Sequence, residues 1–340
     1  MTDHNFWALL GLRQAIALAK RLNETEAAKQ FQQEYDDFYA ALMKRLEEIT
    51  AMSGGYIPPG LDRLGGYDWG NLLGVWPTEV LSPWDAKVSA TQSRARQAFR
   101  EGLMTYANQR YIHNYLTTNL TETSLIRGEQ KTVLQDLYAL LVHTTSTHAG
   151  FETSVLPWAT RDVRGNLTPH GWFAARYRVL LRDMLVREQG HDLHLLSTIS
   201  PRWLRTGIPI GVDNAPTRFG TLGFQLTPDA TGAALNINAE FSHAPQAIVV
   251  HIPYFVILRS VTLDGRTFTL KENGGLTHPS FPRIGTDRVI LAPNTHSVHL
   301  NWRYRSRPDE LSYEFFVEKF KQEFARKYRV YLRERGVMEE

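Results

Sequence analysis

The sequence predicts an α+β multidomain protein, in which alternating helices are followed by an antiparallel β-sandwich and a C-terminal helix. Apolar residues recur at helical spacing from residue 5 to about residue 187. From about 193 to 305 the pattern changes to short alternating runs broken by turn signals, and 308–335 is helical again. We therefore expect three domains or segments, at 1–190, 191–305 and 306–340.

The composition excludes several classes of protein. The 340 residues are 43% hydrophobic and 21% charged, typical of a globular chain with room for two domains. The absence of cysteine excludes a disulfide framework and any thiolate metal site. The net charge of +3 is small, and no clustered basic face suggests nucleic acid. We see neither a membrane span nor a signal peptide, so we expect no membrane partner and favour the cytoplasm.

The helical part divides into seven predicted helices. Asp68 is expected to cap the third, short helix, which ends before Pro77. In the seventh, Thr168 is expected at the N-cap and Pro169 at the first helical position. Besides the short third helix, the predicted helices span residues 5–22, 24–50, 85–105, 110–127, 129–144 and 168–187.

These helices alternate in character along the chain. Polar, aromatic and glycine-containing helices are followed by charged amphipathic ones. Such alternation favours two concentric layers, in which the ends of polar inner helices line a cavity.

The β-sandwich is predicted from short runs in which apolar and polar residues alternate. Asp264-Gly265 between two such runs is a hairpin turn signal. The final helix places five aromatic residues on one stripe, which is expected to pack against a domain. The predicted strands include 235–238, 247–252, 260–263, 289–291 and 298–302, and the stripe is Phe315, Phe316, Phe320, Phe324 and Tyr328.

Aromatic residues, carboxylates, amides and histidines gather at predicted helix ends. The segments are 67–71, 119–123, 147–152 and 166–172. Aromatic faces stack on sugar rings, amides and carboxylates bind hydroxyls, and two carboxyl groups can cleave a glycosidic bond. The mixture therefore predicts a carbohydrate-active site.

The layout resembles the six-hairpin (α/α)6-barrel glycoside hydrolases, with the α-L-rhamnosidase group closest and α-glucosidase and trehalase-like families related. The resemblance covers about residues 1–305, and its strongest segments are 117–123 and 147–152. In these families a catalytic glutamate in a Trp/Phe-Glu segment precedes a His-containing helix and a β-domain. Phe151-Glu152, then Pro169-His170-Gly171-Trp172, match that order.

The resemblance departs from the family in one respect. The family's ring is complete, at about twelve helices, and an earlier hairpin supplies the partner carboxyl group. Here the ring is expected to be a partial toroid. The chain is then a C-terminal fragment, or a homo-oligomer or partner chain completes the ring, or an open half-ring does something other than hydrolysis.

Glu152 is the first choice for the catalytic base, which in an inverting mechanism activates the attacking water. Asp68, between Tyr67 and Trp69, and Glu122 are candidates for the acid. Each also has a structural interpretation, as a helix cap or a hydrogen-bonded carboxylate.

The candidate substrate-binding residues are aromatic, amide and imidazole side chains. Their histidines lack a recognised metal-ligand spacing, so we expect no metal and no cofactor. Packing of the tryptophans is the competing interpretation. The candidates are Trp69, Asn119, His148, Trp158, His170 and Trp172.

The sequence thus predicts hydrolysis of O-glycosidic bonds in an oligosaccharide or glycoside, with Glu152 as the base. The alternative is a non-catalytic carbohydrate-binding or assembly subunit.

Overall fold

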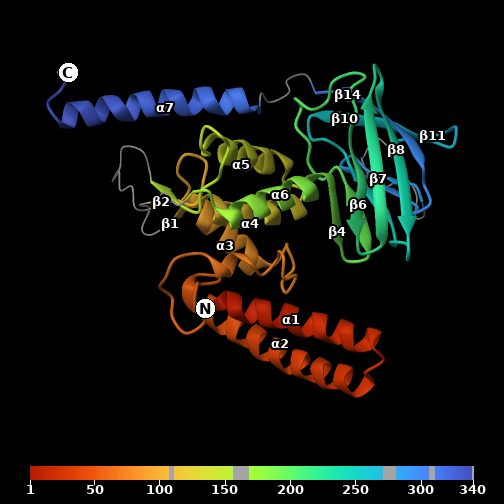
Figure 1. Cartoon of the computed structure of the whole chain (residues 1–340), viewed down its shortest axis with the longest axis horizontal. Helices are drawn as coiled ribbons and strands as arrows, with labels where there is room; N and C mark the ends of the chain where they lie inside the picture. The colour runs from red at the N-terminus through yellow and green to blue at the C-terminus, as the bar shows by residue number, and fades with distance from the viewer. Residues whose placement is uncertain (107–110, 156–167, 271–280, 306–310, 339–340) are drawn as a thin grey trace. The chain divides into compact units, whose positions relative to one another are not determined.

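The computed structural model describes residues 1–106, 111–155, 168–270, 281–305 and 311–338. Contacts between residues divide the chain into two compact units (Figure 1). We call residues 1–127, 143–174 and 323–340 the helical unit, and residues 128–142 and 175–322 the sandwich unit. The α+β class predicted from the sequence is confirmed, while the three expected boundaries remain a prediction.

The helical unit begins with a hairpin of two long helices, α1 (Thr2–Arg21) and α2 (Thr25–Ser53). Their apolar faces meet in a core that contains Phe6, Leu9 and Leu46. The second helix ends at Gly54, whose φ of 82° is the left-handed conformation that favours glycine. The predicted helices 5–22 and 24–50 are therefore confirmed.

Short elements complete the helical unit. They include a three-stranded sheet that the sequence did not predict. The predicted helix 85–105 ends early, because the backbones of Arg100 and Leu103 bond to each other in a tight turn. The elements are η1 (Gly70–Leu72), α3 (Ala86–Gln97), α4 (Asn114–Ile126), the first residues of α6 (Gly171–Leu185), β1 (Thr105–Tyr106), β2 (Tyr111–Ile112) and β3 (Ser154–Val155).

Two predicted helix caps are wrong. Helix α6 begins at Gly171 rather than at Pro169, and its cap is His170, whose Nδ1 accepts the Phe173 N–H at 3.3 Å. Thr168 instead donates its hydroxyl to the carbonyl of Gly150. Asp68 accepts a hydrogen bond from the Asn71 side chain and caps no backbone group of η1.

The sandwich unit contains α5 (Gln130–Val142) and two facing sheets whose inner side chains form one core. One pair of strands, β5 with β9, is parallel, and the other pairings are antiparallel. The six-stranded sheet has the order β11 (Arg266–Thr269), β10 (Val256–Leu263), β14 (Ser297–Tyr304), β8 (Gly232–Phe241), β7 (Gly220–Pro228) and β6 (Ile210–Thr217). The five-stranded sheet has the order β12 (Arg283–Ile284), β13 (Arg288–Leu291), β9 (Ile248–His251), β5 (Asp192–Leu195) and β4 (Val186–Gln189).

The predicted hairpin turn is present between β10 and β11. Asp264 and Gly265 have φ values of 49° and 75°, and Leu263 pairs with Arg266. Two positive φ values suit a tight hairpin turn whose twist matches the flanking strands. Helix α7 (Tyr313–Glu334) follows the sheets and buries Phe316 and Phe320 of the predicted aromatic stripe, whereas Phe315 and Tyr328 are exposed.

A buried histidine pair lies in the five-stranded sheet. Nδ1 of His194 is 2.9 Å from Nε2 of His251, and it accepts a hydrogen bond from the buried Arg187 guanidinium at 3.1 Å. Burial and then the Arg187 charge lower the pKa of His194 to about 2 and that of His251 to about 3. Arg288 lowers both pKa values further, and Asp287 opposes it at His251.

The pair predicts that acid destabilises the sandwich unit. Histidine in the unfolded chain titrates near 6.5, so between about pH 3 and 6.5 the unfolded state binds more protons than the folded state. The free energy of unfolding should be highest above pH 6.5 and fall as the pH decreases. Urea unfolding at pH 7 and pH 5 measures this change. His194→Asn should reduce the difference between the free energies of unfolding at the two pH values. The control variant His299→Gln, at the surface, should not reduce it. Equal stability of the wild type at both pH values would contradict the prediction.

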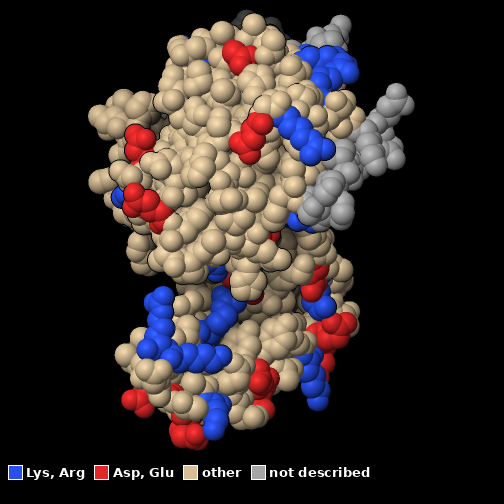
Figure 2. Space-filling view, turned by 90° about the vertical axis from the view of Figure 1, so that its right-hand side faces the viewer, with Lys and Arg blue, Asp and Glu red and all other residues tan. Residues whose placement is uncertain are grey.

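The apolar character of the helices and the charges on one face can be described together. Among the helices of the described residues, none combines the length and the apolar character needed to cross a membrane. On the face drawn in Figure 2, charged side chains of both signs occur and most of the surface is uncharged.

Candidate active site

The candidate site lies in the helical unit, where the start of α4 meets the start of α6. His113 precedes α4, and its Nδ1 accepts the Leu116 N–H at 3.3 Å. Burial, and secondarily the charge of His170, lowers the pKa of His113 to about 3. His113 is therefore a neutral imidazole with its proton on Nε2.

A close approach of two segments sets the position of Glu152. The backbone N–H of His170 donates to the carbonyl of Gly150 at 3.1 Å. A Cβ on Gly150 would lie 1.7 Å from the Phe173 ring, so only glycine lets the chain pass this side chain. Glu152 follows two residues later and comes to lie beside the first residues of α6.

Glu152 is a half-buried carboxylate next to an imidazole. Its Oε2 lies 3.8 Å from Nε2 of His170, and the two side chains are 28% and 18% exposed. Because Nδ1 of His170 accepts a backbone N–H, its Nε2 is the nitrogen that carries a proton and faces Glu152. The carboxylate also lies near Tyr106: burial, then the charges of Tyr67 and Glu152, raise the pKa of that phenol.

Aromatic rings form a continuous series around this carboxylate. Tyr115 has its ring centroid 5.9 Å from those of both His170 and Trp172, and these two are 5.8 Å apart. On the other side, Tyr106 contacts His113 at 5.2 Å and Tyr67 at 4.9 Å. Trp172 is 60% exposed, so its indole is open to a ligand.

Asp68 is adjacent in sequence to Tyr67, whose ring contacts Tyr106 of this group. Its Oδ1 accepts a hydrogen bond from Nδ2 of Asn71 at 2.8 Å, and Asn71 also donates to the Ile57 carbonyl. Asp68 is half-buried and partly used in local structure. Trp69, also half-buried, donates its backbone N–H to the Asn71 side chain.

Helix α4 carries Asn119 and Glu122 into the protein interior. The helix is buried from Asn114 to Leu125 although two thirds of these residues are polar. Its threonines donate to carbonyls of their own helix, as Thr121 does to Thr117. Glu122 is 1% exposed and lies seven residues beyond Tyr115, about 10 Å along the helix axis.

Asn119 is a buried amide whose polar atoms are unsatisfied. It is 0% exposed, and neither Oδ1 nor Nδ2 has a hydrogen-bond partner among the described residues. Such an amide is costly unless water or a ligand satisfies it. Of the other two candidates, His148 is an exposed residue with φ of 59°, and Trp158 falls outside the described residues.

The structure thus brings together Glu152, His170 and Trp172 of the predicted residues. Sequence reasoning missed Tyr106, His113 and Tyr115 as site residues. The signal was available, because His113-Asn114-Tyr115 repeats the polar-aromatic pattern at a helix start that singled out the other segments. The arrangement can accept a proton at Glu152 and offer aromatic faces to an apolar ring surface.

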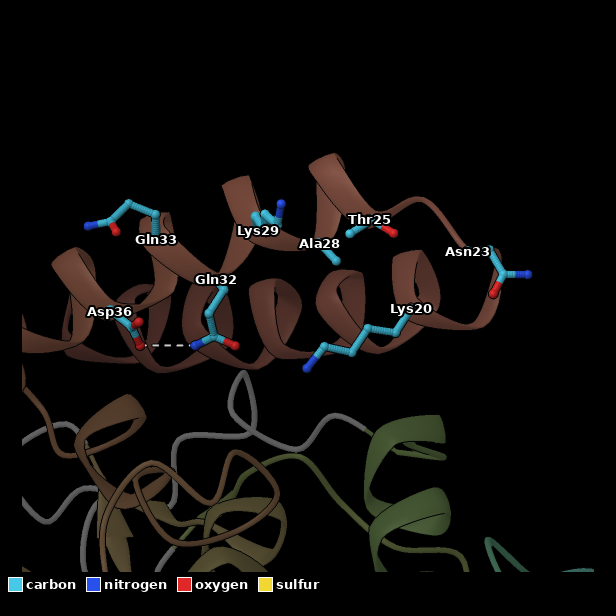
Figure 3. Close-up of a pocket in the computed structure, with 8 residues that line it drawn as sticks. All are labelled: Lys20, Asn23, Thr25, Ala28, Lys29, Gln32, Gln33 and Asp36. Atoms are coloured by element: carbon cyan, nitrogen blue, oxygen red, sulfur yellow. Dashed lines mark hydrogen bonds between the residues drawn. The ribbon is translucent and has the colours of Figure 1, made fainter.

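A separate hollow lies on the α1–α2 hairpin and shares no residue with this site. Figure 3 shows its polar lining, with a hydrogen bond from Gln32 to Asp36. The lining residues are Lys20, Asn23, Thr25, Ala28, Lys29, Gln32, Gln33 and Asp36.

Comparison with known proteins gives a likeness of fold. No family model matches the chain, and no curated protein matches it in sequence. The structure of an α-L-rhamnosidase from Dictyoglumus thermophilum is similar, with a TM-score of 0.51 and 10% sequence identity. The match covers 88% of this chain and 31% of that one, so the chain spans about a third of the similar protein. The likeness is one of fold alone: this chain coarsely shares the arrangement of the matched part of that rhamnosidase.

Proposed function

We propose that this chain is a carbohydrate-active protein that hydrolyses O-glycosidic bonds by a two-carboxylate, inverting mechanism. The observation that carries the proposal is the half-buried carboxylate of Glu152 beside the His170 imidazole, bordered by the exposed indole of Trp172. The likeness to an α-L-rhamnosidase supports it. It also makes α-L-rhamnosides the first substrates to test.

In the proposed reaction Glu152 takes a proton from a water molecule as that water attacks the anomeric carbon. The bond from that carbon to the leaving oxygen breaks, and a second carboxyl group protonates the leaving oxygen. The Nε2–H of His170, 3.8 Å from the carboxylate, is placed to orient the water or a sugar hydroxyl. Trp172 and Tyr115 supply apolar ring faces.

The acid of this mechanism has three candidate sources. Asp68 is favoured over Glu122, since its neighbour Tyr67 contacts Tyr106 next to Glu152. Glu122 is buried in α4, about 10 Å along the helix axis from Tyr115. The third source is a second chain, or a second copy of this one, that completes a helical ring as in the six-hairpin families. The roughly 6.5–9.5 Å that separates acid and base in inverting glycosidases is the criterion for all three.

The proposal is tested by following hydrolysis of a panel of aryl glycosides, beginning with 4-nitrophenyl α-L-rhamnopyranoside. NMR of the first product formed gives its anomeric configuration, which inversion requires to be opposite to that of the substrate. Turnover by the wild type that Glu152→Gln lacks is the expected result. Turnover with retained configuration would overturn the inverting mechanism, and equal turnover by the variant would overturn the assignment of Glu152.

Trp172→Ala should weaken substrate binding more than it slows the chemical step. Removing the exposed indole deletes a stacking surface worth about 1 kcal/mol, so KM should rise about five- to tenfold while kcat changes little. Steady-state kinetics measure both constants. Trp172→Phe, which keeps a ring, should recover most of the loss; an unchanged KM for Trp172→Ala would show that the indole does not contact substrate.

The second candidate function is a non-catalytic carbohydrate-binding or assembly subunit. It is favoured by the low identity of 10% to the similar rhamnosidase, since a fold can be shared without the catalytic activity. Saturable binding of the same glycosides, with no turnover by the wild type and no effect of Glu152→Gln, would select this function.

A further inference from the structure

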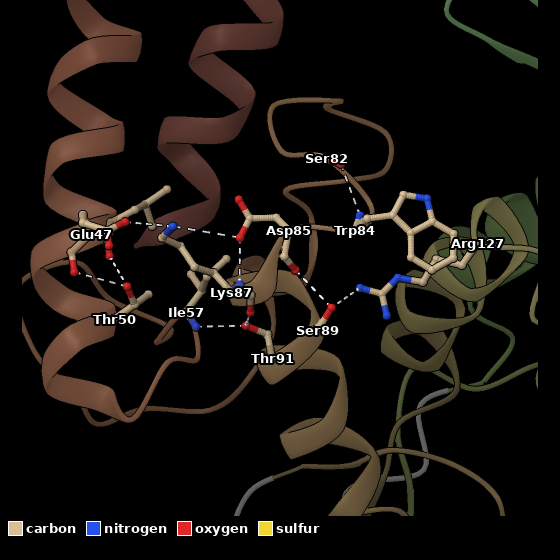
Figure 4. A network of polar contacts seen from close by, with 11 residues as sticks. Glu47, Thr50, Ile57, Ser82, Trp84, Asp85, Lys87, Ser89, Thr91 and Arg127 are labelled. Carbon is tan, nitrogen blue, oxygen red and sulfur yellow. Dashed lines mark hydrogen bonds and ion pairs between the residues drawn. The ribbon is translucent and has the colours of Figure 1, made fainter.

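The helical unit presents another strongly exposed tryptophan outside the segments that form the candidate site. Trp84 is 66% exposed and lies in the loop before α3. The guanidinium carbon of Arg127 lies 5.5 Å from the centre of its ring. Figure 4 shows the indole beside Arg127, in a network of polar side chains.

Hydrogen bonds hold this loop and the guanidinium in place. Nε of Arg127 donates to the Pro83 carbonyl at 2.7 Å, and Nη2 donates to the hydroxyl of Ser89 at 3.0 Å. The backbone N–H of Trp84 donates to Oγ of Ser82, and the backbone N–H of Asp85 donates to the Ser82 carbonyl. The backbone that carries the indole and the guanidinium beside it are therefore held before any ligand arrives, which lowers the entropy lost on binding.

Asp85 joins the same loop to the α1–α2 hairpin. Its Oδ1 accepts the Lys87 N–H at 2.7 Å and caps α3. The ammonium of Lys87 pairs with Glu47 of α2 at 2.8 Å, which raises the pKa of Lys87 (Figure 4). Both ends of the Ser82–Asp85 turn are thus fixed to helices, and the exposed ring is not the tip of a freely moving loop.

We infer that Trp84 is a stacking platform for a pyranose unit of a carbohydrate ligand, at a surface subsite distinct from the Glu152 site. A sugar ring has an apolar C–H face that packs on an indole and hydroxyls that bond to polar neighbours. Trp84 offers the first surface, and Ser82, Ser89 and Arg127 border it with hydroxyl and guanidinium groups. The inference rests on the proposed carbohydrate function for its ligand class.

A protein partner fits this surface less well. Protein interfaces have an apolar core assembled from several side chains. The side chain that the structure places against the exposed Trp84 ring is charged, with the Arg127 guanidinium carbon 5.5 Å from the ring centre. A single ring bordered by polar groups has the size of one sugar unit.

Fluorine NMR of the whole chain labelled with 5-fluorotryptophan tests the inference. The chain has eight tryptophans, and loss of one signal in Trp84→Phe and another in Trp172→Phe assigns those resonances. The probes are methyl α-L-rhamnopyranoside, methyl α-D-glucopyranoside and methyl β-D-galactopyranoside, with glycerol as a polyol that lacks a ring face. We expect the Trp84 signal to shift saturably with at least one glycoside, with a midpoint in the millimolar range, and not with glycerol.

Matched variants separate the platform from the active site. Arg127→Ala should weaken the Trp84 response several-fold, whereas Trp7→Ala, at an exposed tryptophan of α1, should leave it unchanged. A Trp84 signal that stays constant with every glycoside, or moves equally with glycerol, overturns the inference. Hydrolysis or a Trp172 response in that case leaves the proposed function standing, so the two failures are distinguishable. A Trp84 shift caused only by mixing with a second unlabelled copy of the chain would identify a protein contact and overturn the inference as well.

Discussion

Replacement of Glu152 by glutamine should reduce glycoside hydrolysis by about 10²- to 10⁴-fold, the usual contribution of a positioned general base. The amide keeps the shape of the carboxylate but cannot accept a proton from water. Because Glu152 is partly exposed and the His170 imidazole lies 3.8 Å from its carboxylate, folding should be little affected. Rates with 4-nitrophenyl α-L-rhamnopyranoside, or with whichever glycoside the wild type cleaves, measure the effect, and Glu79→Gln at an exposed carboxylate is the matched control.

Chemical rescue distinguishes a base from a residue that only positions substrate. Glu152→Ala opens a space in which azide can attack the anomeric carbon without giving up a proton. The new C–N bond forms as the bond to the leaving oxygen breaks, and the acid still protonates that oxygen. We expect azide to restore turnover and give a glycosyl azide of inverted configuration. Absence of rescue, with sugar binding intact, would count against Glu152 as the base.

Local patterns predicted most of the secondary structure. The hairpin α1–α2, the Asp264-Gly265 turn and five strands of the sandwich follow from short-range signals that the structure confirms. These strands are β8, β9, β10, β13 and β14. The class of fold follows from the change of period near residue 190.

The failed predictions depend on local turns and on contacts between separate segments. Helix α3 stops at Gln97 because the local Arg100–Leu103 turn competes with it, and this turn is followed by a three-stranded sheet. His170 rather than Thr168 caps α6, and the Gly150 carbonyl accepts hydrogen bonds from both residues. No pattern of spacing along the chain contains the pairing of Gly150 with these two residues.

The candidate site shows the same limit. Glu152 was predicted from segment 147–152 and His170 and Trp172 from segment 166–172, and the structure brings them together. Tyr106 and Tyr115 join them from segments about 40 residues away, so their proximity could not be predicted. Polar helices were expected to lie inside, and the burial of Asn119 and Glu122 in α4 is possible because the threonine hydroxyls of this helix bond to their own backbone.

A buried carboxylate that the sequence did not single out is expected to govern the stability of the helical unit. Glu101 has a fully buried side chain, and its Oε1 pairs with Nζ of Lys327 at 3.0 Å. Its Oε2 lies 3.2 Å from Nε2 of His143. Glu101 also has a φ of 55°, an unfavourable conformation for a non-glycine residue that the surrounding contacts must maintain.

Removing one partner of such a group is costly, because the other charge then stays buried without compensation. Lys327→Met should lower the free energy of unfolding by about 3 kcal/mol, since it leaves the Glu101 carboxylate with His143 alone. Glu101→Gln should cost less, because Lys327 is 29% exposed and can turn towards water and Glu323. Urea unfolding of both variants measures these differences.

The double variant decides whether the charges act as a unit. Glu101→Gln combined with Lys327→Met removes both charges, so its loss of stability should be smaller than the sum of the two single losses by at least 1 kcal/mol. Glu323→Ala, which deletes only the half-buried i,i+4 partner of Lys327, should change stability by less than about 0.5 kcal/mol. Additive losses in the double variant would mean that Lys327 stabilises the helix through its aliphatic chain, and that the buried carboxylate is compensated by His143. The same variants should expose the residues after Glu323 to trypsin in proportion to their loss of stability, because Lys327 joins this part of α7 to the buried carboxylate of the helical unit.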